Sequence, residues 1–286
     1  MAFDWSKLGR TPPTALGVAR IHSHHALQWA TKAARANLSA APDDSHSSLE
    51  WDAVHGALFC PPLLSSKGDV RVGLRVADLA LLVARGGRVV DTLTLDGKTN
   101  AAMGAWIDSR LRVAGLKPAG GVELPYAMPR HPVASGRPYD LHMQERELSE
   151  LSRWFGGSAD VLEEFRSKLA GLSPGPGPVR CWPHHFDIAT LVRLEEGAAG
   201  TAKSIGVGVS PGDEYYPQPY AYVSPWPRLD AAQLPKLPHG GHWHTRDFVA
   251  AVATGEEILG LKDRGPGLLA FITGGFEIGR ALLAKR

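Results

Sequence analysis

Hydrophobic and polar positions follow two different periods along this chain. Apolar residues that return every three to four positions predict helices over residues 24–38, 100–116, 144–172, 246–254 and 268–284. Gly156-Gly157 leaves the third segment open as one helix or two. Short β-branched or leucine-rich runs, bounded by Pro, Gly or Asp, predict strands over residues 49–59, 70–76, 79–84, 89–95, 179–194, 204–209 and 220–223. Arg85-Gly86-Gly87-Arg88 is typical of a hairpin turn.

The order of these elements predicts an α+β protein with mixed, largely antiparallel sheets and flanking helices. We place an N-terminal half at residues 1–141 and a C-terminal half at residues 142–286, either as separate halves or as one compact unit. Each half reads as helix, several strands and helix, and Glu50–His55 echoes Cys181–His185. One interpretation is therefore an internal duplication. The alternative is a single mixed sheet with helices on one face.

Composition and charge narrow the function classes. The 286 residues are 44% hydrophobic and 21% charged, as in soluble globular proteins. A formal net charge of +2 gives no broad basic surface, so we expect no nucleic-acid partner. The longest apolar run, Leu79–Ala84, is too short to span a membrane, and M-A-F-D-W-S-K does not begin a signal peptide. We therefore expect a cytoplasmic protein, and the sequence indicates no oligomeric state.

The two cysteines, Cys60 and Cys181, each lie in an apolar, strand-like run. This favours two small buried side chains over a disulfide. A catalytic thiolate at Cys181 is the minor alternative, because that residue lies next to two histidines.

The segment R-C-W-P-H-H-F-D-I-A-T-L, which starts at Arg180, places titratable groups inside a predicted strand. On a continuous strand, His184 shares an apolar face with Trp182, whereas His185 and Asp187 share the other face. His184 is then a core histidine or a substrate contact. The pair His185 and Asp187 suits metal ligation, general acid–base chemistry or a structural hydrogen bond.

Two further clusters lie in the C-terminal half. Asp213 and Glu214 follow a Pro-Gly turn at a strand end, where binding residues concentrate. In the segment H-G-G-H-W-H-T, an extended backbone points His242 and His244 the same way. Thr245 is placed to cap the predicted helix that follows.

Together these residues predict a metal-dependent enzyme that acts on a small molecule. The predicted ligands are His185, Asp187, His242 and His244, and their nitrogen and oxygen donors suit Zn, Fe or Mn. Glu214, with Asp213, is the candidate general base that activates a bound water. The predicted substrate contacts are His184, Tyr215, Tyr220 and Trp226.

Three alternatives stay open. The same residues suit a non-enzymatic small-molecule-binding protein with a polar His/Asp network. His185, Asp187 and His244 also fit the two-histidine, one-carboxylate pattern of non-haem iron oxygenases, but Thr254 stands where those enzymes usually carry an arginine. A structural or interaction protein would use residues 217–239 as a partner surface. The P-loop, H-E-x-x-H and G-x-S-x-G motifs are absent from the sequence.

Several blocks resemble a bacterial family of unknown function. They are R-C-W-P-H-H-F-D-I-A-T-L, S-P-G-D-E-Y-Y-P-Q-P-Y-A-Y-V-S-P-W-P and G-G-H-W-H-T, with W-D-A-V-H-G-A-L and V-G-L-R-V-A-D-L in the N-terminal half. The resemblance covers most of the chain. It implies an intracellular bacterial protein and supports the choice of His184, His185, Asp187, Asp213, Glu214, His242 and His244. It implies no activity, substrate or cofactor.

Overall fold

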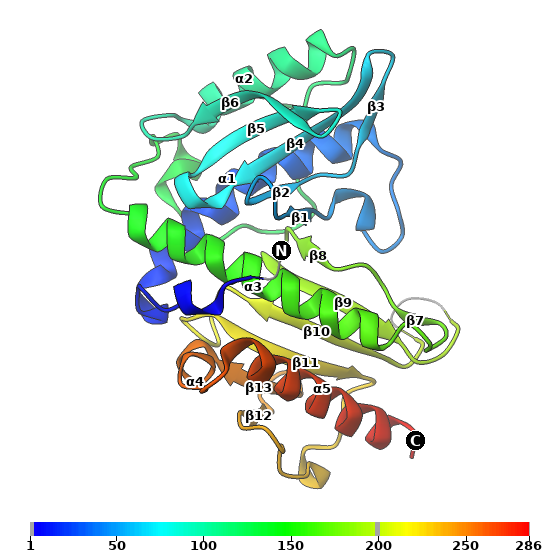
Figure 1. Ribbon diagram of the computed structural model, residues 1–286. Helices are drawn as coiled ribbons and strands as arrows, with labels where there is room; N and C mark the ends of the chain where they lie inside the picture. The colour runs from blue at the N-terminus through cyan, green and yellow to red at the C-terminus, as the bar shows by residue number, and fades with distance from the viewer. Residues whose placement is uncertain (1–2, 198–200, 286) are drawn as a thin grey trace. The chain divides into compact units, whose positions relative to one another are not determined.

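The computed structural model describes residues 3–197 and 201–285, and the chain forms two compact units. The N-terminal unit comprises Leu16–Ser152 and Cys181–Phe186. The C-terminal unit comprises Met1–Ala15, Arg153–Arg180 and Asp187–Arg286. Two largely antiparallel sheets with flanking helices (Figure 1) confirm the predicted α+β class. Each unit is therefore built from segments that are separated in the sequence, and the two units do not follow one another with a single boundary near residue 141.

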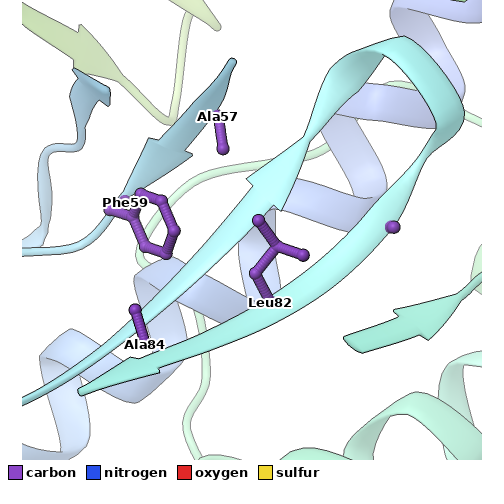
Figure 2. Close-up of a cluster of buried hydrophobic side chains, with 5 residues drawn as sticks. Ala57, Phe59, Leu82 and Ala84 are labelled. Carbon is purple, nitrogen blue, oxygen red and sulfur yellow. The ribbon is translucent and has the colours of Figure 1, made fainter. Parts of the chain in front are cut away.

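Antiparallel strands build the sheet of the N-terminal unit. They are β1 (Glu50–Asp52), β2 (Ala57–Phe59), β3 (Leu63–Ser65), β4 (Gly68–Arg75), β5 (Ala80–Arg85) and β6 (Arg88–Thr94). The order is β1-β2-β4-β5-β6, and β3 pairs with β4. The predicted hairpin turn is confirmed, because Arg85 pairs with Arg88. Figure 2 shows Ala57, Phe59, Leu82 and Ala84 gathered in a buried apolar cluster of this sheet.

The helices begin and end close to most of the predicted limits. They are α1 (Gly17–Asn37), α2 (Asn100–Val113), α3 (Glu145–Lys168), α4 (Gly255–Leu259) and α5 (Arg264–Leu283). Helix α1 begins before the predicted His24, because polar His22 and Ser23 obscure its buried face. Helix α3 is continuous, and a Cβ atom at Gly157 would lie 3.0 Å from ring atoms of Phe3 and Trp5. That glycine therefore permits close packing and does not end the helix. No helix among the described residues is long and apolar enough to cross a membrane.

The C-terminal unit has its own antiparallel sheet, in the order β12-β13-β11-β10-β9-β7. The strands are β7 (Gly175–Pro176), β9 (Asp187–Arg193), β10 (Ser204–Ser210), β11 (Tyr220–Trp226), β12 (His242–His244) and β13 (Ala250–Thr254). Strand β8 (Arg180–Trp182) has its first residue in this unit and the other two in the N-terminal unit. Buried Ile205, Val207, Val223 and Ala251 lie on one face, and α5 packs against β10 and β11 (Figure 1). The opposite face carries polar and aromatic side chains.

Three sequence predictions of secondary structure are wrong. The predicted strand over 49–59 is interrupted by a four-residue turn at residues 53–56, which separates β1 from β2. The predicted strand over 179–194 is interrupted by a tight turn at residues 183–186, in which the amides of His185 and Phe186 donate to the Trp182 carbonyl. The predicted helix over 246–254, with Thr245 as its cap, is a bend followed by strand β13. β13 pairs with a strand on each side, and this pairing overrides the helical propensity of its alanines. Thr254 instead caps the next helix, α4, through a capping box.

The echo between the two halves has a structural counterpart. Strands β1 and β2 flank a four-residue turn at 53–56, and β8 and β9 flank a four-residue turn at 183–186. The last turn residue has a positive φ in both, 58° at Gly56 and 59° at Phe186. This shared backbone conformation supports the hypothesis of an internal duplication.

Candidate functional site

The polar and aromatic face of the C-terminal sheet brings together several of the predicted site residues. Residues paired across antiparallel strands point to the same side of a sheet. Tyr222 pairs with Gly208 on one side and with Val252 on the other, and Val252 also pairs with His242. We call this surface the tyrosine face and define it by Asp187, Asp213, Tyr216, Tyr220, Tyr222, His242 and His244.

A tyrosine–aspartate pair lies at the β9 end of the tyrosine face. The Tyr222 hydroxyl donates to Oδ2 of Asp187, which is 6% exposed. This contact requires a glycine at position 208, because a Cβ atom there would lie 2.6 Å from the Tyr222 hydroxyl oxygen. Burial, and then the charge of Asp187, raise the pKa of Tyr222 well above its usual range. The hydroxyl therefore stays protonated and acts as a hydrogen-bond donor.

Asp213 organises the loop between β10 and β11. Its Oδ1 atom accepts hydrogen bonds from the backbone N–H groups of Tyr215 (2.8 Å) and Tyr216 (3.0 Å). Its Oδ2 atom accepts a 2.6 Å hydrogen bond from the Tyr220 hydroxyl. Burial, and then the charge of Asp213, raise the pKa of Tyr220. The predicted catalytic carboxylate is thus held by three neutral donors.

Tyr216 connects the two predicted histidine ligands. Its hydroxyl oxygen lies 2.9 Å from Nε2 of His242 and 3.0 Å from Nδ1 of His244. Nε2 of His244 lies 2.6 Å from the carbonyl oxygen of Arg246, which can only accept. In its neutral form His244 therefore carries its proton on Nε2 and accepts from Tyr216 through Nδ1, and Tyr216 accepts from His242. The predicted same-side orientation of His242 and His244 is confirmed.

The described residues contain no group of three or more His, Cys, Asp or Glu side chains placed to hold a metal ion. Both ring nitrogens of His244 already have protein partners. His185 belongs to the N-terminal unit, whereas Asp187, His242 and His244 belong to the C-terminal unit. The predicted Zn, Fe or Mn site and the iron-oxygenase arrangement therefore stay predictions.

Of the remaining predicted residues of the C-terminal unit, Tyr215 and Glu214 lie in the loop beside the tyrosine face, whereas Trp226 lies away from it. Tyr215 packs edge-on against His244, with ring centroids 5.2 Å apart, and its hydroxyl donates to Asp247 over 3.2 Å. Glu214 is exposed in the loop before β11. Trp226 is 48% exposed at the far end of β11, six residues from Tyr220 and thus roughly 20 Å along the strand. Trp226 therefore lies away from the other predicted substrate contacts on this strand.

In the N-terminal unit, helix α1 holds the turn that contains the predicted His184 and His185. The Pro183 carbonyl accepts from Nε2 of His24 (2.8 Å) and from Nε2 of Gln28 (2.9 Å). The His184 ring lies 4.1 Å from the His185 ring, centroid to centroid. Burial, and then His185, lower the pKa of His184 to about 4, so this side chain is neutral at pH 7.

The histidines of helix α1 are not among the site residues predicted from the sequence. His24 stacks on Phe186 with centroids 5.2 Å apart, and His22 lies 4.7 Å from the ring of His131. Nε2 of His25 lies 2.8 Å from the Pro129 carbonyl oxygen. The four-residue spacing of His24 and Gln28 was the available signal, because it puts both on one side of a helix.

Cys60 and Cys181 are both buried, as the sequence predicts. Burial raises the pKa of the Cys60 thiol to about 11, so this side chain is not a reactive thiolate at neutral pH.

No family model matches the chain, and neither the curated proteins nor the solved structures contain a significant match. A proposal for the function of this protein therefore depends on the geometry of the site.

Proposed function

We propose that the protein is a non-enzymatic small-molecule-binding protein whose ligand lies on the tyrosine face. The observation that carries the proposal is the convergence of aromatic rings and oriented polar groups. Tyr216 and Tyr220 have ring centroids 4.7 Å apart, and the Tyr216 hydroxyl joins His242 to His244. Small-molecule sites typically combine aromatic walls with a few positioned polar groups. His242 is exposed, so one end of this chain of hydrogen bonds faces solvent.

The hydrogen bonds favour binding over acid–base catalysis. Tyr220 and Tyr222 each donate to a carboxylate, and their pKa values are raised, because of burial first and then the nearby aspartates. A general acid or base works best with a pKa near the working pH. Both hydroxyls are thus suited to holding fixed positions. A metal-dependent enzyme remains the second hypothesis, and metal analysis tests it separately.

A fragment library screened by ligand-observed NMR tests the proposal on the full-length protein. We expect fragments that bind the wild type and lose binding in His242→Ala and Tyr216→Phe, because each change breaks the hydrogen-bond chain. His142→Ala is the matched control, because His142 is exposed and belongs to the N-terminal unit. The absence of hits, or hits that bind both variants as tightly as the wild type, would contradict a ligand site on the tyrosine face.

We also propose a cytoplasmic location. Cys60 and Cys181 are buried thiols, which suits a reducing compartment. The nearly balanced charge, 31 basic and 29 acidic residues, supports a small-molecule partner rather than a nucleic acid.

A further inference from the structure

We call the rings of Tyr215 and Tyr216 the rim of the tyrosine face. One cation of the protein itself already lies on this rim. The guanidinium carbon of Arg246 lies 4.9 Å from the centroid of the Tyr215 ring. The Arg246 side chain is 70% exposed, so packing does not force it onto the ring. Its Nε atom lies 3.7 Å from Oδ2 of Asp247. Ring faces attract cations through their quadrupole, and this contact shows that the rim suits one.

Two carboxylates near these rings, Asp213 and Glu214, are not neutralised by the contacts that position them, whereas Asp247 forms an ion pair with Arg246. Asp213 accepts from two backbone N–H groups and from the Tyr220 hydroxyl, all of which are neutral. Within the described ranges, no salt bridge involves Asp213 or Glu214. Asp247 is 66% exposed, accepts from the Tyr215 hydroxyl and pairs with Arg246 in an ion pair that solvent screens. The rim therefore combines π faces with negative charge.

The tyrosines respond to this charge. Partial burial, and then Asp213 and Glu257, raise the pKa of Tyr216. Loss of solvent contact, and then Asp247 and Glu214, raise the pKa of Tyr215. Arg246 acts in the opposite direction on both hydroxyls. Negative potential at a site raises the local concentration of cations and lowers that of anions.

We propose that the ligand of the tyrosine face is a small, weakly hydrated organic cation, of the quaternary ammonium or guanidinium kind, bound beside Arg246 on the rings of Tyr215 and Tyr216. This inference rests on the proposed function and adds the chemical class of the ligand. A cation of this kind loses little hydration when it contacts an aromatic ring. Asp213 and Asp247 supply the countercharge, and the exposed Arg246 competes for the same rings.

NMR titration of the full-length protein with tetramethylammonium and with its neutral counterpart, tert-butanol, tests the ligand class. We expect tetramethylammonium to bind about tenfold more tightly, since the cation–π and charge contributions together amount to roughly one factor of ten. Asp247→Asn and Asp213→Asn should each weaken tetramethylammonium binding about threefold to tenfold. Arg246→Ala should strengthen it, because that change removes a competing positive charge.

Glu277→Gln is the matched acidic control, because Glu277 lies on α5, the helix that packs against the sheet. Asp247→Asn is the decisive variant, because Asp247 is exposed, whereas Asp213 also holds its loop. Equal affinities for tetramethylammonium and tert-butanol overturn the cation assignment. Unchanged tetramethylammonium affinity in Asp247→Asn, together with weaker tetramethylammonium binding in Arg246→Ala, overturns it as well. Fragment binding that still depends on His242 would then leave the proposed function standing. If nothing binds the wild type, both proposals fail.

Discussion

Protonation of the buried His24 side chain makes the free energy of unfolding of the N-terminal unit depend on pH. The side chain is 7% exposed, stacks on Phe186 and lies 2.8 Å through Nε2 from the Pro183 carbonyl oxygen. Burial lowers its pKa from 6.5 to about 4, and the contact with Pro183 only partly opposes this shift. Because the unfolded chain binds the proton more readily, folding is least favourable where His24 is protonated.

The sign and size follow from proton linkage. Between about pH 6.5 and about pH 4 the unfolded state carries more protons, so stability is complete above pH 6.5 and is lost as the pH falls. A shift of about 2.5 pKa units corresponds to roughly 3 kcal/mol in the limit of low pH. Between about pH 8 and about pH 5, the same two pKa values give a loss of about 2 kcal/mol.

Urea denaturation of wild type and His24→Gln, followed by circular dichroism at several pH values, measures this loss. Glutamine keeps an N–H donor for Pro183 and does not titrate. We expect the stability advantage of the wild type over the variant to shrink by about 2 kcal/mol from about pH 8 to about pH 5. His142→Gln, at an exposed site, should follow the wild type at every pH. Parallel curves for wild type and His24→Gln would refute the reasoning.

Three further predictions concern packing, capping and metal. Gly208→Ala should lower the free energy of unfolding by about 2 kcal/mol, because the added methyl would lie 2.6 Å from the Tyr222 hydroxyl oxygen. The control Gly206→Ala should change the free energy of unfolding little, because no heavy atom lies closer than 3.8 Å to the added methyl; equal effects of the two variants would contradict this account. Thr254→Ala should cost about 1 kcal/mol in urea denaturation through the lost capping box, and exposed Thr245→Ala almost nothing; a neutral Thr254→Ala would count against the cap. Elemental mass spectrometry of untagged protein should find metal well below one equivalent; near-equimolar metal that disappears in both His185→Ala and His244→Ala would instead support the metal-dependent enzyme.

Sequence periodicity was sufficient for most of the fold. Short apolar runs separated by turn residues predicted β4, β5, β6, β10 and β11. The alternation of side chains along H-W-H predicted that His242 and His244 point the same way. These features depend on neighbours in the sequence, so a local pattern contains the information. The strand β13 was missed because its alanines favour a helix locally, and only pairing with β11 and β12 makes them extended.

The site was predictable only in part, because its contacts depend on register. Tyr222 and Asp187 are 35 residues apart, and they meet only because glycine at 208 lets the ring cross strand β10. The turn at 183–186 was hidden for a different reason. A phenylalanine with positive φ is uncommon, and here stacking on His24 accompanies it. Helix α1 supplies that partner from far away in the sequence.

The interleaving of the two units has a consequence for how the chain folds during synthesis. The Phe3 amide donates to Asp160, 157 residues later, and His24 contacts the Pro183 carbonyl, 159 residues later. Contacts of such long sequence separation form slowly, because a large loop must close first. When the ribosome has made only the first 152 residues, neither unit has all its parts. The N-terminal unit can be completed only after Phe186 is made, and the C-terminal unit only near the end of synthesis. A nascent chain of 152 residues therefore exposes unfinished apolar surface to chaperones and proteases.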